Sequence, residues 1–256
     1  MIKDTDNRQT KLKTISLKPR FSPNAQLSLG LEGNHHSNLS DFYPGDQNRV
    51  VITLIRRLLG KTSDKHLGIH GPTQVGKTHL LTGACMAAQD SGVPSGYLPM
   101  ADIVDQMPAT ILEGLDYLGL ICLDDLHAIC GREDWEQALL ALCVRVQARA
   151  GRVLMSANQD LNHLPWRISA FLAYLISGCL IFPCYPLKES EKQTLVEEHA
   201  MLTGLLMPPV VSKFLVKQYG DNTTGLLQSI HRIKEHTVGL KRKLTVPQVK
   251  DILALV

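Results

Sequence analysis

Short apolar runs alternate with helix-like patterns through the middle of the chain. Apolar runs of about five residues predict buried strands, whereas apolar positions three and four residues apart predict helices. Strands that alternate with helices form parallel sheets covered on both faces, so we predict an α/β domain over residues 41–186. The predicted strands are His66–His70, Gly96–Met100, Gly119–Leu123, Arg152–Ser156 and Cys179–Cys184, and the predicted helices are Lys77–Ala88, Ala101–Leu112 and Trp135–Ala150.

The pattern changes after Pro186, where only helical periodicity follows. Residues 187–256 are therefore predicted to form a small all-helical second domain. Its predicted helices are Lys188–Leu202, Pro208–Tyr219, Asn222–Val238 and Val246–Leu255. Residues 1–40 are rich in Asn, Ser, Lys and Gly and show little periodicity, which predicts a flexible N-terminal tail.

Composition narrows the class of protein. With 44% apolar and 20% charged residues in 256, the chain is predicted to fold, and a net charge of +3 does not by itself indicate a nucleic-acid binder. The six cysteines form no CxxC pair, and no cysteine pair accompanies His35 and His36, so neither disulfides nor a zinc site are expected. No apolar run reaches the ~20 residues of a membrane span, and the N-terminus lacks a secretory signal. We expect a cytoplasmic protein without membrane contact.

The stretch HGPTQVGKT, residues 70–78, matches the phosphate-loop pattern G-x-x-x-x-G-K-[ST] between a predicted strand and a predicted helix. Gly71 and Gly76 let the backbone curl, so that the N–H groups of the loop, including those of Gln74 and Val75, face the phosphates. Lys77 is expected on the β and γ oxygens, and Thr78 is expected to offer its hydroxyl to Mg²⁺. The stretch predicts a site for ATP or ADP with Mg²⁺.

Two acids follow the predicted strand Gly119–Leu123, at the sheet edge where ligands of open α/β folds bind. Asp124 is the candidate Mg²⁺ ligand, through water, and Asp125 is the candidate to orient an attacking water. Asn158 follows the next predicted strand. Its amide is either a third catalytic candidate, directed at the γ-phosphate or the water, or an ordinary asparagine in a turn.

With this order of parts, the chain resembles AAA+ ATPases of the DnaA branch, and within that branch the Hda regulators of replication. Phe42–Asp46, with the sequence FYPGD, looks like the segment that lies near the adenine, which makes Tyr43 a candidate contact. Gly131–Ala150 begins with the GxxxWExA pattern of the helix after the acidic strand, and Arg242–Pro247 resembles the last lid segment. The resemblance implies an AAA+ domain followed by a helical lid, and possible homodimers.

One apolar island stands in the tail, QLSLGL. It resembles the peptide by which Hda proteins dock on the DNA sliding clamp. The glutamine amide suits a polar subsite, and the leucines suit an apolar groove met by an extended backbone. The candidate clamp-binding residues are Gln26, Leu27, Ser28, Leu29 and Leu31. Contact with DNA is then expected only indirectly, through the clamp.

The chain departs from the family pattern at two arginines. The arginine that reaches a neighbouring subunit's nucleotide is replaced by Ala170 in one alignment and by Leu175 in another, which leaves Arg167 as the local substitute. Thr224 stands where the lid arginine is expected. These losses leave it open whether the protein is an enzyme, because such a finger contributes on the order of 10³-fold or more to hydrolysis.

The resemblance implies a regulator that binds nucleotide and the clamp and inactivates DnaA, so restraining replication initiation. Two alternatives remain open. One is a nucleotide-gated adaptor on the clamp without catalytic output, and the other is a loader ATPase of the DnaC and IstB type. The helix-turn-helix module with which DnaA reads its DNA boxes is not expected.

Overall fold

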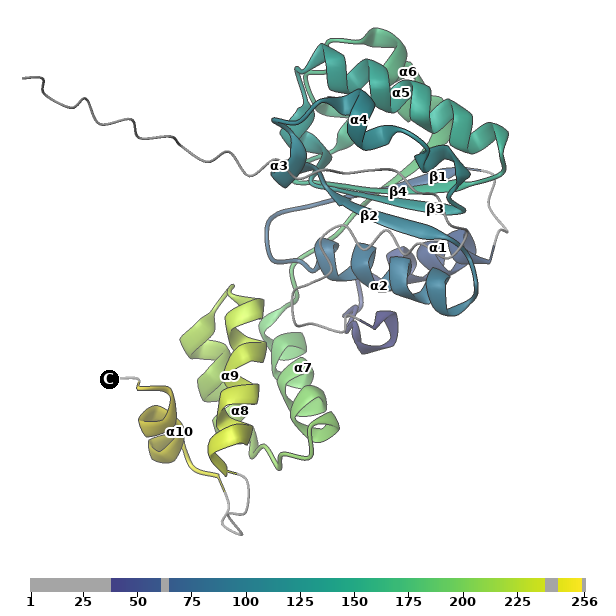
Figure 1. The fold of residues 1–256 in the computed structure, drawn as a ribbon. Coiled ribbons are helices and arrows are strands. Elements are labelled where there is room, and N and C mark those ends of the chain that lie inside the picture. The colour runs from purple at the N-terminus through teal and green to yellow at the C-terminus, as the bar shows by residue number, and fades with distance from the viewer. Residues whose placement is uncertain (1–37, 61–64, 238–243, 255–256) are drawn as a thin grey trace, which may run out of the picture.

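The computed structural model describes residues 38–60, 65–237 and 244–254. Its centre is a sheet of five parallel strands in the order β2-β3-β4-β1-β5 (Figure 1). The strands are β1 (His66–His70), β2 (Ser95–Pro99), β3 (Leu120–Asp124), β4 (Arg152–Ala157) and β5 (Cys179–Pro183). The predicted fold class, a parallel α/β sheet followed by a helical lid, is confirmed.

Successive side chains of a strand point to opposite sides of the sheet. Because the strands are apolar along most of their length, both faces of the sheet are apolar. In β3, Leu120 and Cys122 join the core under α1 and α2, whereas Ile121 and Leu123 join the core on the other face. Helices α1 (Arg49–Leu59) and α2 (Lys77–Asp90) cover the first face. The second is covered by α3 (Met100–Ile103), α4 (Pro108–Leu112), α5 (Glu133–Ala148) and α6 (Ser169–Gly178).

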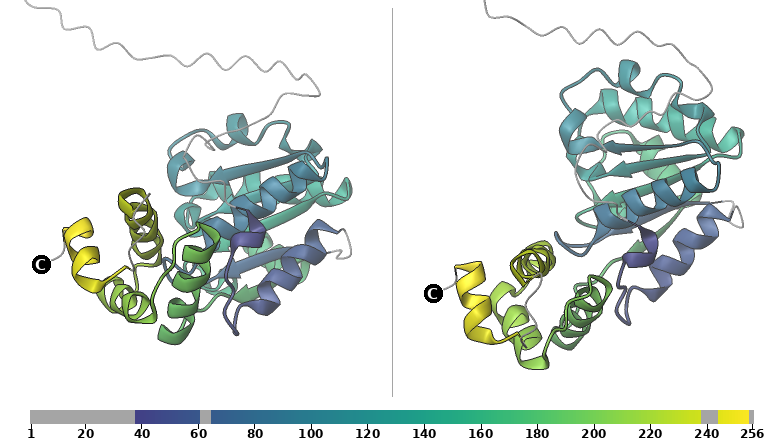
Figure 2. Two further views of the ribbon diagram at one scale, coloured as in Figure 1. Left: turned by 90° about the horizontal axis from the view of Figure 1, so that it is seen from below. Right: turned by 60° about the horizontal axis from the view of Figure 1, so that its bottom comes forward.

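The lid is a separate bundle with its own apolar core (Figure 2). It consists of α7 (Glu189–Leu202), α8 (Pro209–Tyr219), α9 (Thr223–Thr237) and α10 (Val246–Leu253). Short 3-10 helices complete the described elements: η1 (Leu39–Asp41), η2 (Leu115–Tyr117), η3 (Leu126–Ile129) and η4 (Leu161–His163).

Predicted elements end within two residues of the observed ones, with one exception. The prediction of one helix over Ala101–Leu112 is wrong. Helix α3 ends at Ile103, and α4 begins at Pro108. Proline cannot donate the helical hydrogen bond and forces the preceding residue toward extended backbone, and Met107 has ψ 119°. Helices α1 and α6 were not predicted.

Residues 38–48, here called the strap, connect the two parts of the molecule. The 3-10 helix η1 within the strap lies between α2 and α7 in all views (Figures 1 and 2). Buried Asn48 bonds both ways to Tyr185, donating from Nδ2 to its carbonyl at 2.9 Å and accepting its N–H at 2.8 Å. Glu191 of α7 accepts the N–H of Asp46 at 2.8 Å. The strap therefore holds the connection between β5 and the lid.

Candidate nucleotide site

The phosphate loop has the backbone its sequence requires. Gln74 and Gly76 take left-handed φ angles of 65° and 91°, which turn successive N–H groups inward as in an anion-binding nest. A side chain at Gly76 would come within 2.6 Å of the Phe42 ring, and one at Gly71 would overlap the carbonyl of Cys184. Both glycines are thus required by close approach as well as by backbone geometry.

Lys77 begins α2 and is only 7% exposed. Its Nζ donates to the carbonyls of Gly71 at 2.8 Å and Pro72 at 2.9 Å, so its charge lies over the loop itself. Burial lowers the pKa of Lys77, and the neighbouring carboxylates of Asp125 and Asp124 oppose that shift. The ammonium is held at the centre of the loop, where phosphate oxygens would compete for it.

Asp124 is the hub of the site and is 3% exposed. Its Oδ2 accepts the Thr78 hydroxyl at 2.7 Å and the Tyr97 hydroxyl at 2.8 Å, and its Oδ1 accepts the hydroxyl of Ser156. Burial and the adjacent carboxylate of Asp124 hold the pKa of Tyr97 well above its ordinary value. The fold thus brings the predicted Thr78 and Asp124 into direct contact, and their oxygen atoms are of the kind that Mg²⁺ prefers.

Asp125 lies beside this hub in a strained conformation, with φ 54° although it is not glycine. Its N–H donates to Ser156 Oγ at 2.9 Å, and its Oδ1 lies 3.9 Å from Nδ1 of His127. The same Nδ1 accepts the backbone N–H of Asn158 at 3.3 Å. His127 therefore joins two predicted catalytic residues. His127, Ser156 and Tyr97 were not predicted from the sequence, because each acts through a neighbouring residue and belongs to no motif.

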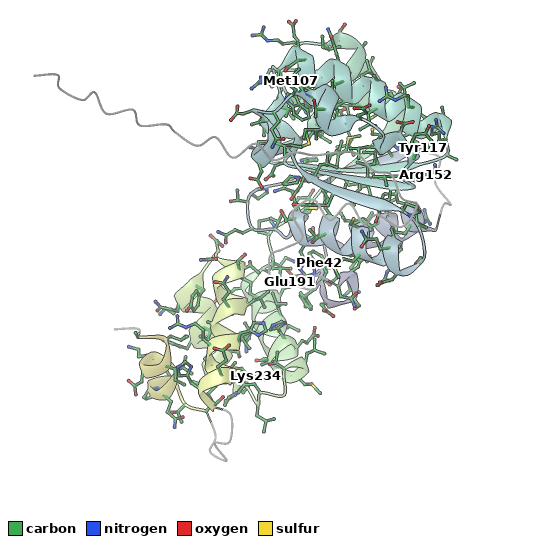
Figure 3. All side chains as sticks on the ribbon, in the orientation of Figure 1. Phe42, Met107, Tyr117, Arg152, Glu191 and Lys234 are labelled. Carbon is green, nitrogen blue, oxygen red and sulfur yellow. The ribbon has the colours of Figure 1, made fainter. Side chains whose placement is uncertain are left out.

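On the strap side, Phe42 lies where the two parts of the molecule meet (Figure 3), and its ring touches the loop. Its ring edge packs on Gly76, and its ring centroid is 5.7 Å from that of His79 on α2. His79 Nε2 lies 3.2 Å from the carbonyl of Asn38, which ties the start of the strap to the same helix. Tyr43 is half-buried in the next position, and its contact with adenine stays a prediction.

Burial distinguishes the two positions at which the family's arginine could stand. Leu175 is fully buried in the core beneath α6, so an arginine has no place there, whereas Ala170 is exposed near the start of the same helix. Arg167 is exposed and lies 3.8 Å from Glu133, and its backbone N–H donates to Glu136 at 2.8 Å. Thr224 is exposed in the first turn of α9.

The comparisons with known proteins agree with this architecture. Residues 189–253 match the family model described as Hda, lid domain. Domain III of the Thermotoga maritima replication initiation protein DnaA is similar over 86% of this chain and 97% of its own, with 15% identity and a TM-score of 0.70. The helical lid therefore resembles the lid domain of Hda proteins, and the fold of the chain is that of DnaA domain III.

Two further solved structures share this fold. AMPPCP-bound DnaA from Aquifex aeolicus is 17% identical, with 82% of this chain and 68% of that chain covered and a TM-score of 0.67. The RuvB Holliday junction branch migration motor of Thermotoga maritima is 13% identical, with 79% and 68% covered and a TM-score of 0.58. At these identities the likeness is one of fold.

Some of the predicted functional residues lie outside the described ranges. These are the clamp-binding candidates Gln26, Leu27, Ser28, Leu29 and Leu31, together with Arg242 and Lys243 of the last lid segment. Within the described ranges, no helix is long and apolar enough to cross a membrane.

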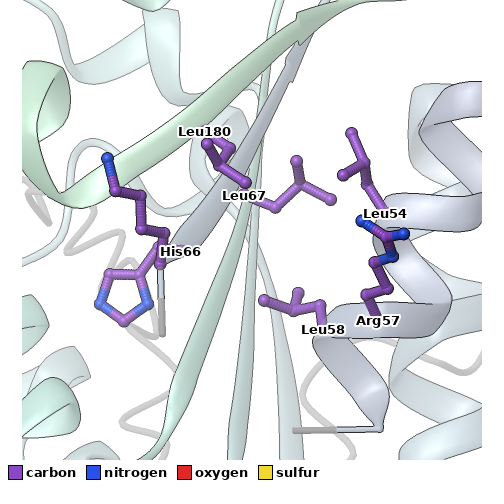
Figure 4. A pocket seen from close by; sticks show the side chains of 7 residues that line it. Leu54, Arg57, Leu58, His66, Leu67 and Leu180 are labelled. Atoms are coloured by element: carbon purple, nitrogen blue, oxygen red, sulfur yellow. The ribbon is translucent and has the colours of Figure 1, made fainter. Parts of the chain in front are cut away.

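A small pocket opens at the other end of β1, away from the phosphate loop (Figure 4). It has a volume of about 100 Å³ and lies between α1 and the sheet. Leu54, Leu58, Leu67 and Leu180 form its apolar walls, with Arg57, Lys65 and His66 at its edges. The pocket is separate from the candidate nucleotide site, because the loop follows the carboxyl end of the strand.

Proposed function

We propose that this Hda-like protein binds ATP or ADP with Mg²⁺, docks on the DNA sliding clamp and inactivates DnaA, so restraining replication initiation. The observation that carries the nucleotide part is the 2.7 Å hydrogen bond from Thr78 to Asp124, which joins the phosphate loop to the acidic strand. The AMPPCP in the similar Aquifex aeolicus DnaA supports an adenine nucleotide. In this proposal residues 41–186 hold the nucleotide and residues 187–256 close over it.

Thr78 and Asp124 would hold Mg²⁺, which supplies charge neutralisation at the phosphate oxygens. Lys77 would leave the carbonyls of Gly71 and Pro72 for the phosphates, and the loop N–H groups would orient them. Asp125, held by Ser156 and next to His127, is the candidate to accept a proton from water.

Clamp docking is assigned to Gln26–Leu31. An extended peptide can place the glutamine amide at a polar subsite and alternate leucines in an apolar groove. Pull-down with purified sliding clamp should retain the wild type and the control Gln9→Ala, and should lose Gln26→Ala and Leu29→Ala. Equal retention of all four proteins, or of none, would contradict the assignment.

The effect on DnaA separates a catalyst from an adaptor. The assay is hydrolysis of DnaA-bound ATP in the presence of clamp and DNA, with and without this protein. Stimulation would support inactivation through hydrolysis. Binding to DnaA without stimulation would favour the adaptor, to which Ala170 and Thr224, in place of arginines, also point.

A further inference from the structure

Two histidines from different lid helices face each other. His199 of α7 and His231 of α9 place their Nε2 atoms 3.2 Å apart, with ring centroids 5.1 Å apart and planes at 77°. They are separated by 32 residues in the sequence, so ligand spacing along the chain does not reveal them. The packing of α7 on α9 creates the pair.

The separation suits a shared metal ion. Two imidazole nitrogens bound to one ion at about 2.1 Å and at a tetrahedral angle lie about 3.4 Å apart. Without an ion, the two Nε2 atoms can form a hydrogen bond only if one ring carries the proton there and the other does not. A metal ion instead uses the lone pairs of both nitrogens.

The helices hold the two rings in place. Val196 and Ala200 flank His199 on α7, Ile230 precedes His231 on α9, and all three are fully buried in the lid core. Rotation of either helix would expose these residues to water. Ligands on rigid, packed helices need little reordering when an ion binds.

We propose that His199 and His231 form a binding site for a divalent transition-metal ion that prefers imidazole, such as Zn²⁺ or Ni²⁺, with water in the remaining positions. In the described ranges no third protein ligand converges on the pair. Such an ion ties α7 to α9. This site is independent of the nucleotide and of the proposed function.

The test is calorimetric titration of the tag-free full chain with Ni²⁺ and with Zn²⁺, the thiols being kept reduced. His199→Ala and His231→Ala should each weaken affinity at least tenfold, whereas His236→Ala, an exposed histidine on the same helix, should leave it unchanged. Ni²⁺ should bind more tightly than Co²⁺, following the usual order for nitrogen ligands.

Because His199 is half-buried, His199→Ala could lower stability as well as metal affinity, so a second variant that keeps a polar side chain is needed. His199→Gln keeps a polar group there and should lose metal affinity while its thermal unfolding matches that of the metal-free wild type. If the wild type binds no ion, or if the double variant His199→Ala/His231→Ala titrates as the wild type does, the pair is only a hydrogen bond and the proposal fails.

Discussion

At the scale of single residues, the candidate site is organised by groups that no motif contains. Asp124 is shared by Thr78, Tyr97 and Ser156, and Ser156 also accepts the N–H of Asp125. A buried carboxylate that accepts several hydrogen bonds is fixed in position. The sequence therefore identifies the acids and the loop, but their positioning depends on residues from two neighbouring strands.

Lys77→Ala should abolish nucleotide retention. The ammonium is the cation that this loop offers to phosphate oxygens, and it already lies over the loop. Equilibrium binding of a fluorescent ADP analogue with Mg²⁺ measures the effect, with Lys213→Ala, on the exposed side of α8, as the control. Retention equal to that of the wild type would mean that the loop is not a phosphate site.

Acid should destabilise the protein through His66, which is 1% exposed. Burial and the charge of Arg152 lower its pKa to about 4, and its Nδ1 accepts the N–H of Val153 at 3.1 Å. Between pH 6.5 and 4 the unfolded chain therefore binds a proton that the folded chain does not, so stability falls as the pH falls. The shift corresponds to about 3 kcal/mol in total.

Urea unfolding at a series of pH values checks this expectation. His66→Asn keeps an acceptor for the N–H of Val153 and cannot be protonated, so it should flatten the dependence of stability on pH in that range. A variant as acid-sensitive as the wild type would assign the effect to other groups.

At the scale of elements, helices with a clear apolar stripe were predicted from the sequence, whereas a helix without such a stripe was not. In α5, Trp135, Leu139, Leu142 and Val146 are fully buried at the spacing that predicted the helix. In α6 the sequence SAFLAYLISG is apolar almost throughout, so no face stands out, although only Phe171 and Leu175 are buried. Helix α1 has a clear apolar stripe, although it was not predicted. The stripe consists of the buried residues Val51, Ile52, Ile55 and Leu58.

Asn48→Ala should loosen the connection between the strap and the lid. Asn48 is buried, and its loss leaves the backbone groups of Tyr185 without their partners, at a cost of about 1–3 kcal/mol. Chemical denaturation gives the change in the free energy of unfolding. The neighbouring exposed residue provides the control Gln47→Ala, which should be neutral. Equal stability of the two variants would show that the connection does not depend on this contact.

At the scale of the whole molecule, the strap connects the α/β part and the lid, which were predicted as separate domains. Phe42 packs on the phosphate loop, while Asp46 and Asn48 bond to the lid and to its connection. Two domains were predicted from the change in periodicity, but a segment that crosses between them leaves no periodic signal. The strap thus contacts the phosphate loop, the lid and the connection between β5 and the lid.

The last prediction concerns the complex with DnaA. If the missing arginine limits hydrolysis, Ala170→Arg should increase the stimulation of DnaA-bound ATP hydrolysis, by up to about 10³-fold if the geometry is met. The position tolerates arginine because it is exposed, whereas Leu175→Arg would bury a charge and should prevent folding. Ile176→Arg adds the same charge at a residue that is 60% exposed on α6 and should leave hydrolysis unchanged. Equal rates for the two exposed variants would contradict the assignment of Ala170. A wild-type stimulation abolished by Arg167→Ala would instead identify Arg167 as the working finger, which would have to leave its position near Glu133 to reach DnaA.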